Sequence, residues 1–170
     1  MGQGCAVTTL NYLAYGSNLF APRLAARISI RGVVGTIVLP GYRLAFNKRG
    51  ADGSGKCDLQ PCPGERAHGV VYRIEAVAKP TLDRIEGVGH GYRVDVWRDA
   101  LHGDCFFYRA EESALDDALR PFDWYHAYVL AGACQHDLAP DYVAAIAAVP
   151  TQVDHDAIRR AENFARLAKG

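Results

Sequence analysis

Gly16, Ser17 and Asn18 follow an apolar run that ends at Tyr15, and they precede a stretch of helical character. Gly16 can adopt a positive φ, and Ser17 and Asn18 can each cap a helix that begins near Leu19. Such a turn leaves backbone N–H groups unpaired at the helix start, where they can bind a carboxylate or a developing oxyanion. The tripeptide therefore predicts an anion-binding loop, with an ordinary strand-to-helix turn as the alternative.

A carboxylate far along the chain is the second group that could do chemistry. Glu86 ends a short helical segment and precedes the glycine-rich run Gly87-Val88-Gly89-His90-Gly91. Its apolar neighbours Ile85 and Val88 would exclude part of the water around it, which suits a group that takes and returns protons. The alternative is an exposed glutamate at a helix end.

Other reactive side chains give weaker signals. Tyr92 and Tyr125 could each place a hydroxyl in a cleft, or serve as core residues with a hydrated tip. Ser17 lacks the Gly-x-Ser-x-Gly setting of an activated serine, and the sequence nominates no His and acid to activate it. Cys57 follows Lys56, which leaves a catalytic thiol as a minor alternative. No pair of histidines has the spacing of a metal site, so we expect no metal.

The elements that must position these groups change in type along the chain. Short runs rich in β-branched and aromatic residues predict six strands, at residues 11–15, 32–39, 42–47, 69–74, 92–97 and 105–108. Helices are predicted at residues 20–28 and 79–85, and apolar spacings of three and four residues predict only helices beyond Pro121. This order indicates an α+β domain whose mainly antiparallel sheet closes into a small β-barrel with peripheral helices.

Composition narrows the classes of partner. The chain has 170 residues, the size of one domain, and 19 basic residues balance 19 acidic ones. Without a basic run we expect no nucleic-acid partner, and without a long apolar run we expect no membrane partner and a cytoplasmic protein. Five scattered cysteines argue against a disulfide framework.

Taken together, several segments resemble the gamma-glutamylcyclotransferase family. The loop Tyr12-Leu13-Ala14-Tyr15-Gly16-Ser17-Asn18-Leu19 is similar to its N-terminal substrate loop, and Leu82-Asp83-Arg84-Ile85-Glu86-Gly87 is similar to its glutamate turn. Further landmarks follow in the order of the bacterial members: Phe46-Asn47-Lys48-Arg49, Asp52-Gly53-Ser54-Gly55-Lys56-Cys57, Gly69-Val70-Val71-Tyr72 and Asp123-Trp124-Tyr125. The resemblance extends from about Tyr12 to Pro150.

The resemblance implies a single domain over residues 1–170, with a tail at 1–10 and a helical extension at 151–170. It implies a cofactor-independent transferase or lyase that converts a γ-glutamyl compound into 5-oxoproline and a free amine or amino acid, as in glutathione metabolism. Glu86 would be the general acid/base. The substrate would be bound by Tyr15, Gly16, Ser17, Asn18, Leu19, Tyr92 and Tyr125.

The substrate would accordingly be a small γ-glutamyl molecule. For the oligomeric state, both a monomer and a homodimer are compatible with the sequence. Two alternatives remain beside the cyclotransferase. One is a non-catalytic module that binds an acidic metabolite through the same loop. The other is an enzyme that removes a γ-glutamyl protecting group from a larger natural product, which differs only in the leaving group.

Overall fold

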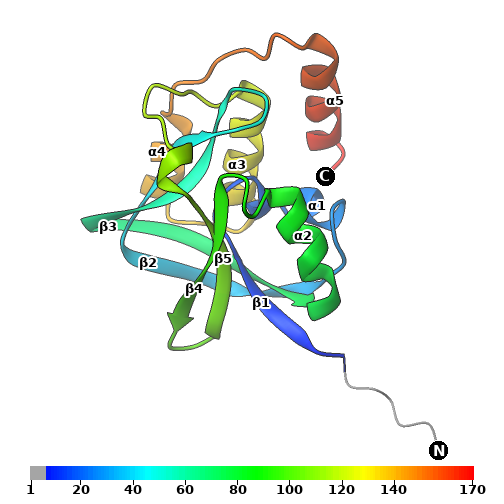
Figure 1. Ribbon diagram of the computed structural model, residues 1–170, viewed down its shortest axis with the longest axis vertical. Coiled ribbons are helices and arrows are strands. Elements are labelled where there is room, and N and C mark those ends of the chain that lie inside the picture. The colour runs from blue at the N-terminus through cyan, green and yellow to red at the C-terminus, as the bar shows by residue number, and fades with distance from the viewer. Residues whose placement is uncertain (1–6) are drawn as a thin grey trace, which may run out of the picture.

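A five-stranded, mainly antiparallel sheet organises the protein (Figure 1). The computed structural model describes residues 7–170. The strands follow the spatial order β2-β3-β1-β5-β4, and only β1 and β5 pair in parallel. Their bounds are β1 Thr9–Ala14, β2 Ile30–Arg49, β3 Gly55–Glu75, β4 Tyr92–Asp99 and β5 Gly103–Ala110. The predicted α+β class and mainly antiparallel sheet are thus confirmed.

The number of strands differs from the six that the sequence predicts. The predicted strands 32–39 and 42–47 form one strand, β2, because the chain passes Pro40 and Gly41 with a shift in register rather than a turn. Opposite it, β3 starts at Gly55 and continues through Pro61 and Pro63. Prolines and glycines argue against a strand in sequence, yet pairing with β2 keeps this segment extended.

The sheet curls without closing, so the predicted barrel describes it only loosely. In the described residues, backbone pairing does not join the edge strands β2 and β4. Side chains span the gap instead: the rings of Tyr42 on β2 and Trp97 on β4 meet edge to face, with centroids 6.0 Å apart. Nearby, the backbone N–H of Ala110 donates to Asp58 Oδ1 over 2.8 Å and ties β5 to β3.

Helices flank the sheet, and those beyond the last strand gather at one end of the molecule, opposite the tip of the β4–β5 hairpin (Figure 1). Their bounds are α1 Ala21–Ala25, α2 Lys79–Glu86, α3 Asp123–Gln135, α4 Pro140–Ala147 and α5 Ala157–Leu167. The helix predicted at 79–85 and the helical region beyond Pro121 are confirmed. The helix predicted at 20–28 is shorter, and Phe20 rather than Ser17 or Asn18 is its N-cap residue.

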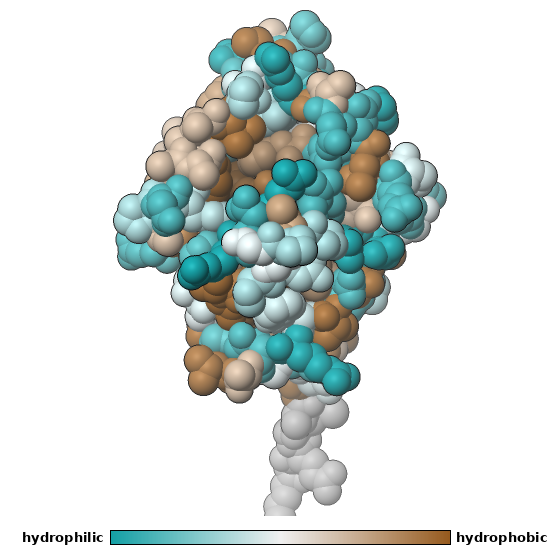
Figure 2. Space-filling view, turned by 90° about the vertical axis from the view of Figure 1, so that its left-hand side faces the viewer, coloured by the Kyte–Doolittle hydropathy of each residue, from teal (hydrophilic) through white to brown (hydrophobic). Residues whose placement is uncertain are grey.

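Hydrophobic and charged residues mix on the outer face of the molecule. Figure 2 shows hydrophilic and hydrophobic residues interspersed on one face, with a hydrophobic hollow in its upper part. Several strand valines are exposed, including Val33, Val38 and Val96, because one side of the curled sheet faces solvent. Among the helices of the described residues, none is long and apolar enough to cross a membrane.

The two ends of the chain were predicted as a tail over residues 1–10 and a helical extension over residues 151–170. Residues 1–6 of the predicted tail lie outside the described residues, and β1 already begins at Thr9. In the predicted extension 151–170, α5 packs on α3, where Tyr128 Oη donates to the carbonyl of Asn163 over 2.9 Å. The single-domain assignment stays a prediction.

Helix α3 presses against the loop that follows β1. A Cβ built on Gly132 would lie 2.4 Å from Leu19 Cβ and 2.4 Å from the backbone N of Phe20. Glycine at this position therefore lets the helix backbone approach the loop more closely than any other residue would allow. On the same helix, Val129 and Ala133 are fully buried against the core.

Gly132→Ala tests this close approach. Alanine normally stabilises a helix interior by about 0.5–1 kcal/mol relative to glycine. Here the added methyl group overlaps the loop, so we expect the free energy of unfolding in urea to fall by about 1–3 kcal/mol. Ala161→Gly, at an exposed position of α5, is the control. It measures the difference in helix propensity between alanine and glycine, about 1 kcal/mol, without a change in packing. A Gly132→Ala protein as stable as the wild type would show that the loop yields without cost.

Candidate functional site

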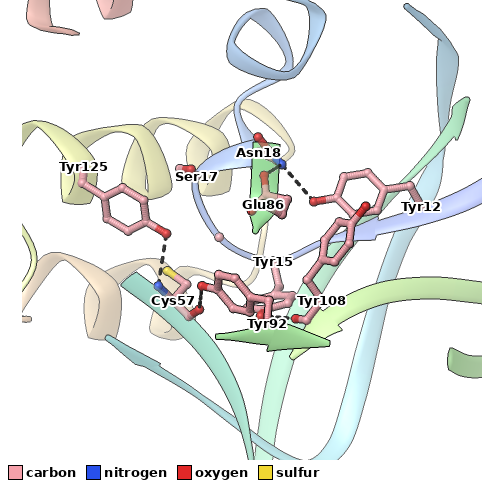
Figure 3. A pocket seen from close by; sticks show the side chains of 10 residues that line it. Tyr12, Tyr15, Ser17, Asn18, Cys57, Glu86, Tyr92, Tyr108 and Tyr125 are labelled. Atoms are coloured by element: carbon pink, nitrogen blue, oxygen red, sulfur yellow. Dashed lines mark hydrogen bonds between the residues drawn. The ribbon is translucent and has the colours of Figure 1, made fainter. Parts of the chain in front are cut away.

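A small pocket lies where the loop after β1 meets the end of α2 (Figure 3). Its wall includes five tyrosines, Tyr12, Tyr15, Tyr92, Tyr108 and Tyr125. The other lining residues are Gly16, Ser17, Asn18, Cys57 and Glu86. We call this the inner pocket. Its volume is about 20 Å³, roughly enough for one ordered water molecule.

Glu86 is held in the inner pocket by two donors. Its Oε1 accepts from Asn18 Nδ2 over 2.9 Å and from Arg27 Nη1 over 2.8 Å. The same Arg27 nitrogen donates to Asn18 Oδ1 over 3.0 Å, so the three side chains form a closed triangle. Only 18% of the Glu86 side chain is exposed. A glutamate and a loop 68 residues apart in sequence are thereby joined.

The second carboxylate oxygen of Glu86 is left available. Within residues 7–170, no side chain or backbone group donates a hydrogen bond to Oε2. Gly87 ends α2 directly after the glutamate in the left-handed conformation, with φ 80°, so the carboxylate sits at a sharp, fixed chain reversal. One oxygen is therefore anchored and the other can accept a proton.

The loop itself departs from its predicted form. Gly16 has φ −108°, not a positive φ. Glycine is needed there because a Cβ would lie 2.9 Å from Cys57 Cβ. Asn18 does not cap a helix either, because its side chain is used by Glu86 and by the hydroxyl of Tyr12, which accepts from Nδ2 over 2.9 Å.

Backbone donors of the loop face no acceptor of the described chain. The 3₁₀ turn Ser17–Leu19 closes through a bond from the Leu19 N–H to the Gly16 carbonyl over 2.9 Å. No acceptor among residues 7–170 takes up the N–H groups of Ser17 and Asn18. The far end of the turn is fixed by Tyr72 Oη, which donates to the Leu19 carbonyl over 2.6 Å.

Buried phenols hold the strands around the pocket. Tyr92 Oη donates to the carbonyl of Cys57, and the N–H of Cys57 donates to Tyr125 Oη over 3.1 Å. Tyr15 Oη donates to the carbonyl of Tyr108. Burial raises the pKa of Tyr15, Tyr92 and Tyr125 well above the ordinary value. These phenols therefore stay neutral and act through hydrogen bonds.

The two nucleophiles weighed from sequence have no activating partner here. Burial raises the pKa of the Cys57 thiol to about 12, which leaves little thiolate at neutral pH. Ser17 Oγ accepts from Arg23 Nε over 3.1 Å, and no histidine lines the inner pocket. Cys57, Cys62, Cys105 and Cys134 are free thiols, while Cys5 lies outside the described residues.

A larger pocket adjoins the first and shares Ser17, Glu86, Tyr92 and Tyr125 with it. We call it the outer pocket, and its volume is about 540 Å³. Six basic residues contribute to its lining, Arg23, Arg27, Lys48, Arg49, Lys56 and Arg159. The acidic residues in the lining are Asp52 and Glu86. The entrance to the site is therefore strongly basic.

Aromatic rings support these cations. Lys56 Nζ lies 4.6 Å from the ring centroid of Tyr125 and forms an ion pair with Asp52 at 2.7 Å. Arg23 stacks on Tyr128, with its guanidinium carbon 4.2 Å from the centroid. Burial, and then repulsion from Arg27, lowers the pKa of Arg23 to about 10, so it remains charged at neutral pH. Within residues 7–170, no group of three or more His, Cys, Asp or Glu side chains is arranged to hold a metal ion.

Most of the residues predicted for the site come together. Tyr15, Gly16, Ser17, Asn18, Glu86, Tyr92 and Tyr125 all line the inner pocket. Leu19 lines neither pocket, because its side chain is fully buried in the core. The roles of these residues stay predictions.

Sequence reasoning missed several residues that the structure adds to the site. Arg27 is the most important, and the spacing of four residues between Arg23 and Arg27 was a usable signal, because it places both on one side of a helical turn. Tyr108 and Lys48 reach the pockets only through strand pairing and the curl of the sheet. Nothing local in the sequence marks Tyr108, and Lys48 is marked only by its place in the segment Phe46-Asn47-Lys48-Arg49.

Comparisons with known proteins bear on the fold. No protein-family model matches the sequence, and no curated protein matches it. Among solved structures, a gamma-glutamyl cyclotransferase has a TM-score of 0.80 and 21% identity, over 96% of this chain and 100% of that chain. The human uncharacterized protein loc79017 has a TM-score of 0.75 and 23% identity, over 85% and 89% of the two chains. YkqA from Bacillus subtilis has a TM-score of 0.71 and 24% identity, over 85% of this chain and 56% of its own. The chain therefore has a gamma-glutamylcyclotransferase-like fold.

Two side chains of the outer pocket, Trp124 and Arg159, bond to one buried carboxylate, Asp154. Trp124 Nε1 donates to Asp154 Oδ2 over 2.8 Å, and Arg159 Nε donates to the same oxygen over 2.6 Å. The Asp154 side chain is fully buried. The hydrogen bonds from Arg159 hold the pKa of this carboxyl well below its usual range. This contact fixes Trp124 and Arg159, which both line the outer pocket.

Asp154 should contribute to stability in a pH-dependent way. Its folded-state pKa is depressed, so its stabilising effect is present above the unfolded value of about 3.9 and is lost as pH falls toward the folded value. We expect Asp154→Asn to lower the free energy of unfolding at pH 7 by about 1–3 kcal/mol. Its stability should also fall less steeply than that of the wild type below about pH 4.

Urea unfolding across the pH range measures both effects. Asp104→Asn is the matched control, because Asp104 pairs with Arg98 at 3.4 Å on the surface, with 66% of its side chain exposed. If the two variants show the same loss and the same acid profile, the Asp154 pair does not stabilise the fold.

Proposed function

We propose that the protein is a gamma-glutamylcyclotransferase-like enzyme that converts a γ-glutamyl amide into 5-oxoproline and a free amine or amino acid. One observation carries the proposal: the carboxylate of Glu86 meets the loop side chain of Asn18 at 2.9 Å inside a shared pocket. A proton-transferring group and an anion-binding loop therefore lie within the reach of one small substrate. The fold shared with a gamma-glutamyl cyclotransferase adds support.

The reaction needs no nucleophile from the protein. The α-amine of the substrate attacks its own γ-carbonyl carbon, a five-membered lactam forms, and the bond to the leaving amine breaks. Holding the folded-back conformer exploits effective molarities that reach about 10⁵ M in well-oriented systems. This accounts for a site in which Ser17 and Cys57 are not activated.

Glu86 moves the protons in this scheme. Its free Oε2 takes one proton from the α-ammonium group before attack and delivers it to the leaving nitrogen. After attack, the same oxygen takes the second proton from the ring nitrogen and passes it to the departing amine, which leaves as an ammonium group, so both protons are accounted for. Arg27 and Asn18 hold Oε1 and so fix the direction of Oε2. A well-placed acid/base contributes about 10²- to 10⁴-fold to the rate.

The loop supplies the anion-binding groups. The unpaired N–H groups of Ser17 and Asn18 bind either the substrate carboxylate or the oxyanion that develops on the γ-carbonyl. Removing one oxyanion donor costs about 3 kcal/mol in comparable sites. Tyr15, Tyr92 and Tyr125 would line the glutamyl site as neutral phenols, with the glutamyl group in the region where the inner and outer pockets join.

Two other functions each have an observation in their favour. The small inner pocket and the ion pair between Glu86 and Arg27 suit a module that binds an acidic metabolite without turnover. The outer pocket of about 540 Å³ suits the removal of a γ-glutamyl group from a bulky amine. Both alternatives use the same loop, and they differ from the main proposal in turnover and in leaving group.

A substrate panel separates the three functions. We expect purified protein incubated with γ-glutamyl dipeptides and γ-glutamylamines to release 5-oxoproline, measured by mass spectrometry. Turnover of a bulky γ-glutamyl amide alone would select the protecting-group activity. Saturable binding in calorimetry with no 5-oxoproline from any compound would select the binding module and overturn the enzymatic proposal.

Glu86→Gln tests the proton-transfer role on a substrate of that panel. The change keeps the shape and removes the titrating group, so we expect a folded protein whose rate is about 10²- to 10⁴-fold lower. Glu162→Gln is the control, because that side chain is 59% exposed on α5 and lies outside both pockets. A Glu86→Gln enzyme that works at close to the wild-type rate, with an unchanged thermal midpoint, would exclude Glu86 as the acid/base.

A further inference from the structure

Lys48 is a buried cation without an acidic partner. The residue is 7% exposed and lies near the end of β2. Its Nζ sits 4.4 Å from the ring centroid of Tyr92, and no hydrogen bond or ion pair within residues 7–170 engages it. A charged group taken out of water without a partner is costly, so such a lysine calls for a counter-charge.

The outer pocket does not supply that counter-charge. Four of its other basic residues are already paired, in the ion pairs Arg27–Glu86, Lys56–Asp52, Arg49–Asp116 and Arg159–Asp154. Both acidic residues of the lining are used in these pairs. Lys48 and Arg23 are therefore the two Lys or Arg residues of the outer-pocket lining that form no ion pair within residues 7–170.

These two cations have different contacts within the pocket. Arg23 donates to Ser17 Oγ and stacks on Tyr128, which keeps it beside the anion-binding loop. Lys48 lies over Tyr92 on the side of Glu86. Burial lowers the pKa of Lys48, and the negative charge of Glu86 acts in the opposite direction, as expected for neighbours. Lys48 and Glu86 thus line the outer pocket close enough to interact electrostatically.

We propose that Lys48 forms a subsite for an anionic group, a carboxylate or a phosphate, on the amine that leaves the γ-glutamyl substrate. This inference rests on the proposed function. The inner pocket is much the smaller of the two, at about 20 Å³ against about 540 Å³, so a leaving group is accommodated better in the outer pocket. The leaving amine must lie next to Glu86 to receive its proton, so the rest of that group extends into the outer pocket and toward Lys48.

A matched pair of substrates tests the subsite. γ-Glutamyl-alanine and its C-terminal carboxamide differ by one negative charge on the leaving group. We expect the wild type to favour the carboxylate by about 10- to 100-fold in kcat/KM, the range for a hydrogen bond to a charged group. A phosphonate in place of the carboxylate distinguishes the two anion classes: the faster of the two acids identifies the class that the subsite accepts.

Variants assign the preference to Lys48. Lys48→Met should reduce the ratio of the two kcat/KM values to about 1, and Lys48→Arg, which keeps the charge, should retain most of the preference. Arg98→Met is the control for loss of one positive charge, because that side chain is 86% exposed on β4 and lies outside both pockets. It should leave the ratio as in the wild type.

The outcomes separate this inference from the proposed function. A wild type that turns over both compounds equally overturns the subsite and leaves the cyclotransferase standing. Equal weakening of both compounds by Lys48→Met places Lys48 at the glutamyl end and also overturns it. If neither compound is turned over, the proposed cyclotransferase activity is rejected, and calorimetric titration with both compounds then tests the subsite. Tighter binding of the carboxylate compound that is lost in Lys48→Met supports the subsite. Equal binding of the two compounds rejects it.

Discussion

The triangle of Glu86, Asn18 and Arg27 is the contact on which the site depends. It joins the loop after β1 to the last residue of α2, two segments that the chain brings from 68 residues apart. The contact uses one carboxylate oxygen and leaves the other without a donor in the described chain. The contact therefore fixes the orientation of Glu86 through Oε1 alone.

The geometry of the triangle depends on the position of the loop that carries Asn18. Contacts from α3, β3 and the sheet hold that loop in place. Gly132 allows the backbone of α3 to approach Leu19 and Phe20. Cys57 on β3 packs so closely on Gly16 that no side chain fits there. Tyr72 holds the Leu19 carbonyl from the sheet. A rigid loop is what binding by backbone N–H groups requires, since those groups cannot adjust independently of one another.

Electrostatics divides the site into two regions. The inner pocket is lined by neutral phenols around one paired carboxylate, so Glu86 is the acidic side chain in its lining. The outer pocket is basic, a charge distribution that attracts anions. Aromatic rings lie against Arg23, Lys48 and Lys56. Because the face of a ring attracts a cation, these contacts offset part of the repulsion between the positive charges.

The sequence alone determined the features that depend on residues close together in the chain. The α+β class, the helical C-terminal region and the turns at Gly16–Asn18 and Glu86–Gly87 follow from residue types and short spacings, and the structure contains them. These features are set within a few residues, so they can be read without knowledge of the fold. The merging of two predicted strands into β2 could not be read, because pairing with β3 decides whether Pro40-Gly41 is a turn or a bulge.

Tertiary structure decided which side chains meet. Arg27 bonds Glu86, the N–H of Cys57 bonds Tyr125, and Lys48 reaches the outer pocket through contacts between segments distant in sequence. The use of Asn18 is the clearest case: by sequence it is a helix cap, and in the fold its amide serves Glu86 instead. A short polar side chain can satisfy either partner, and only the packing of α2 and α3 around the loop determines which one it bonds.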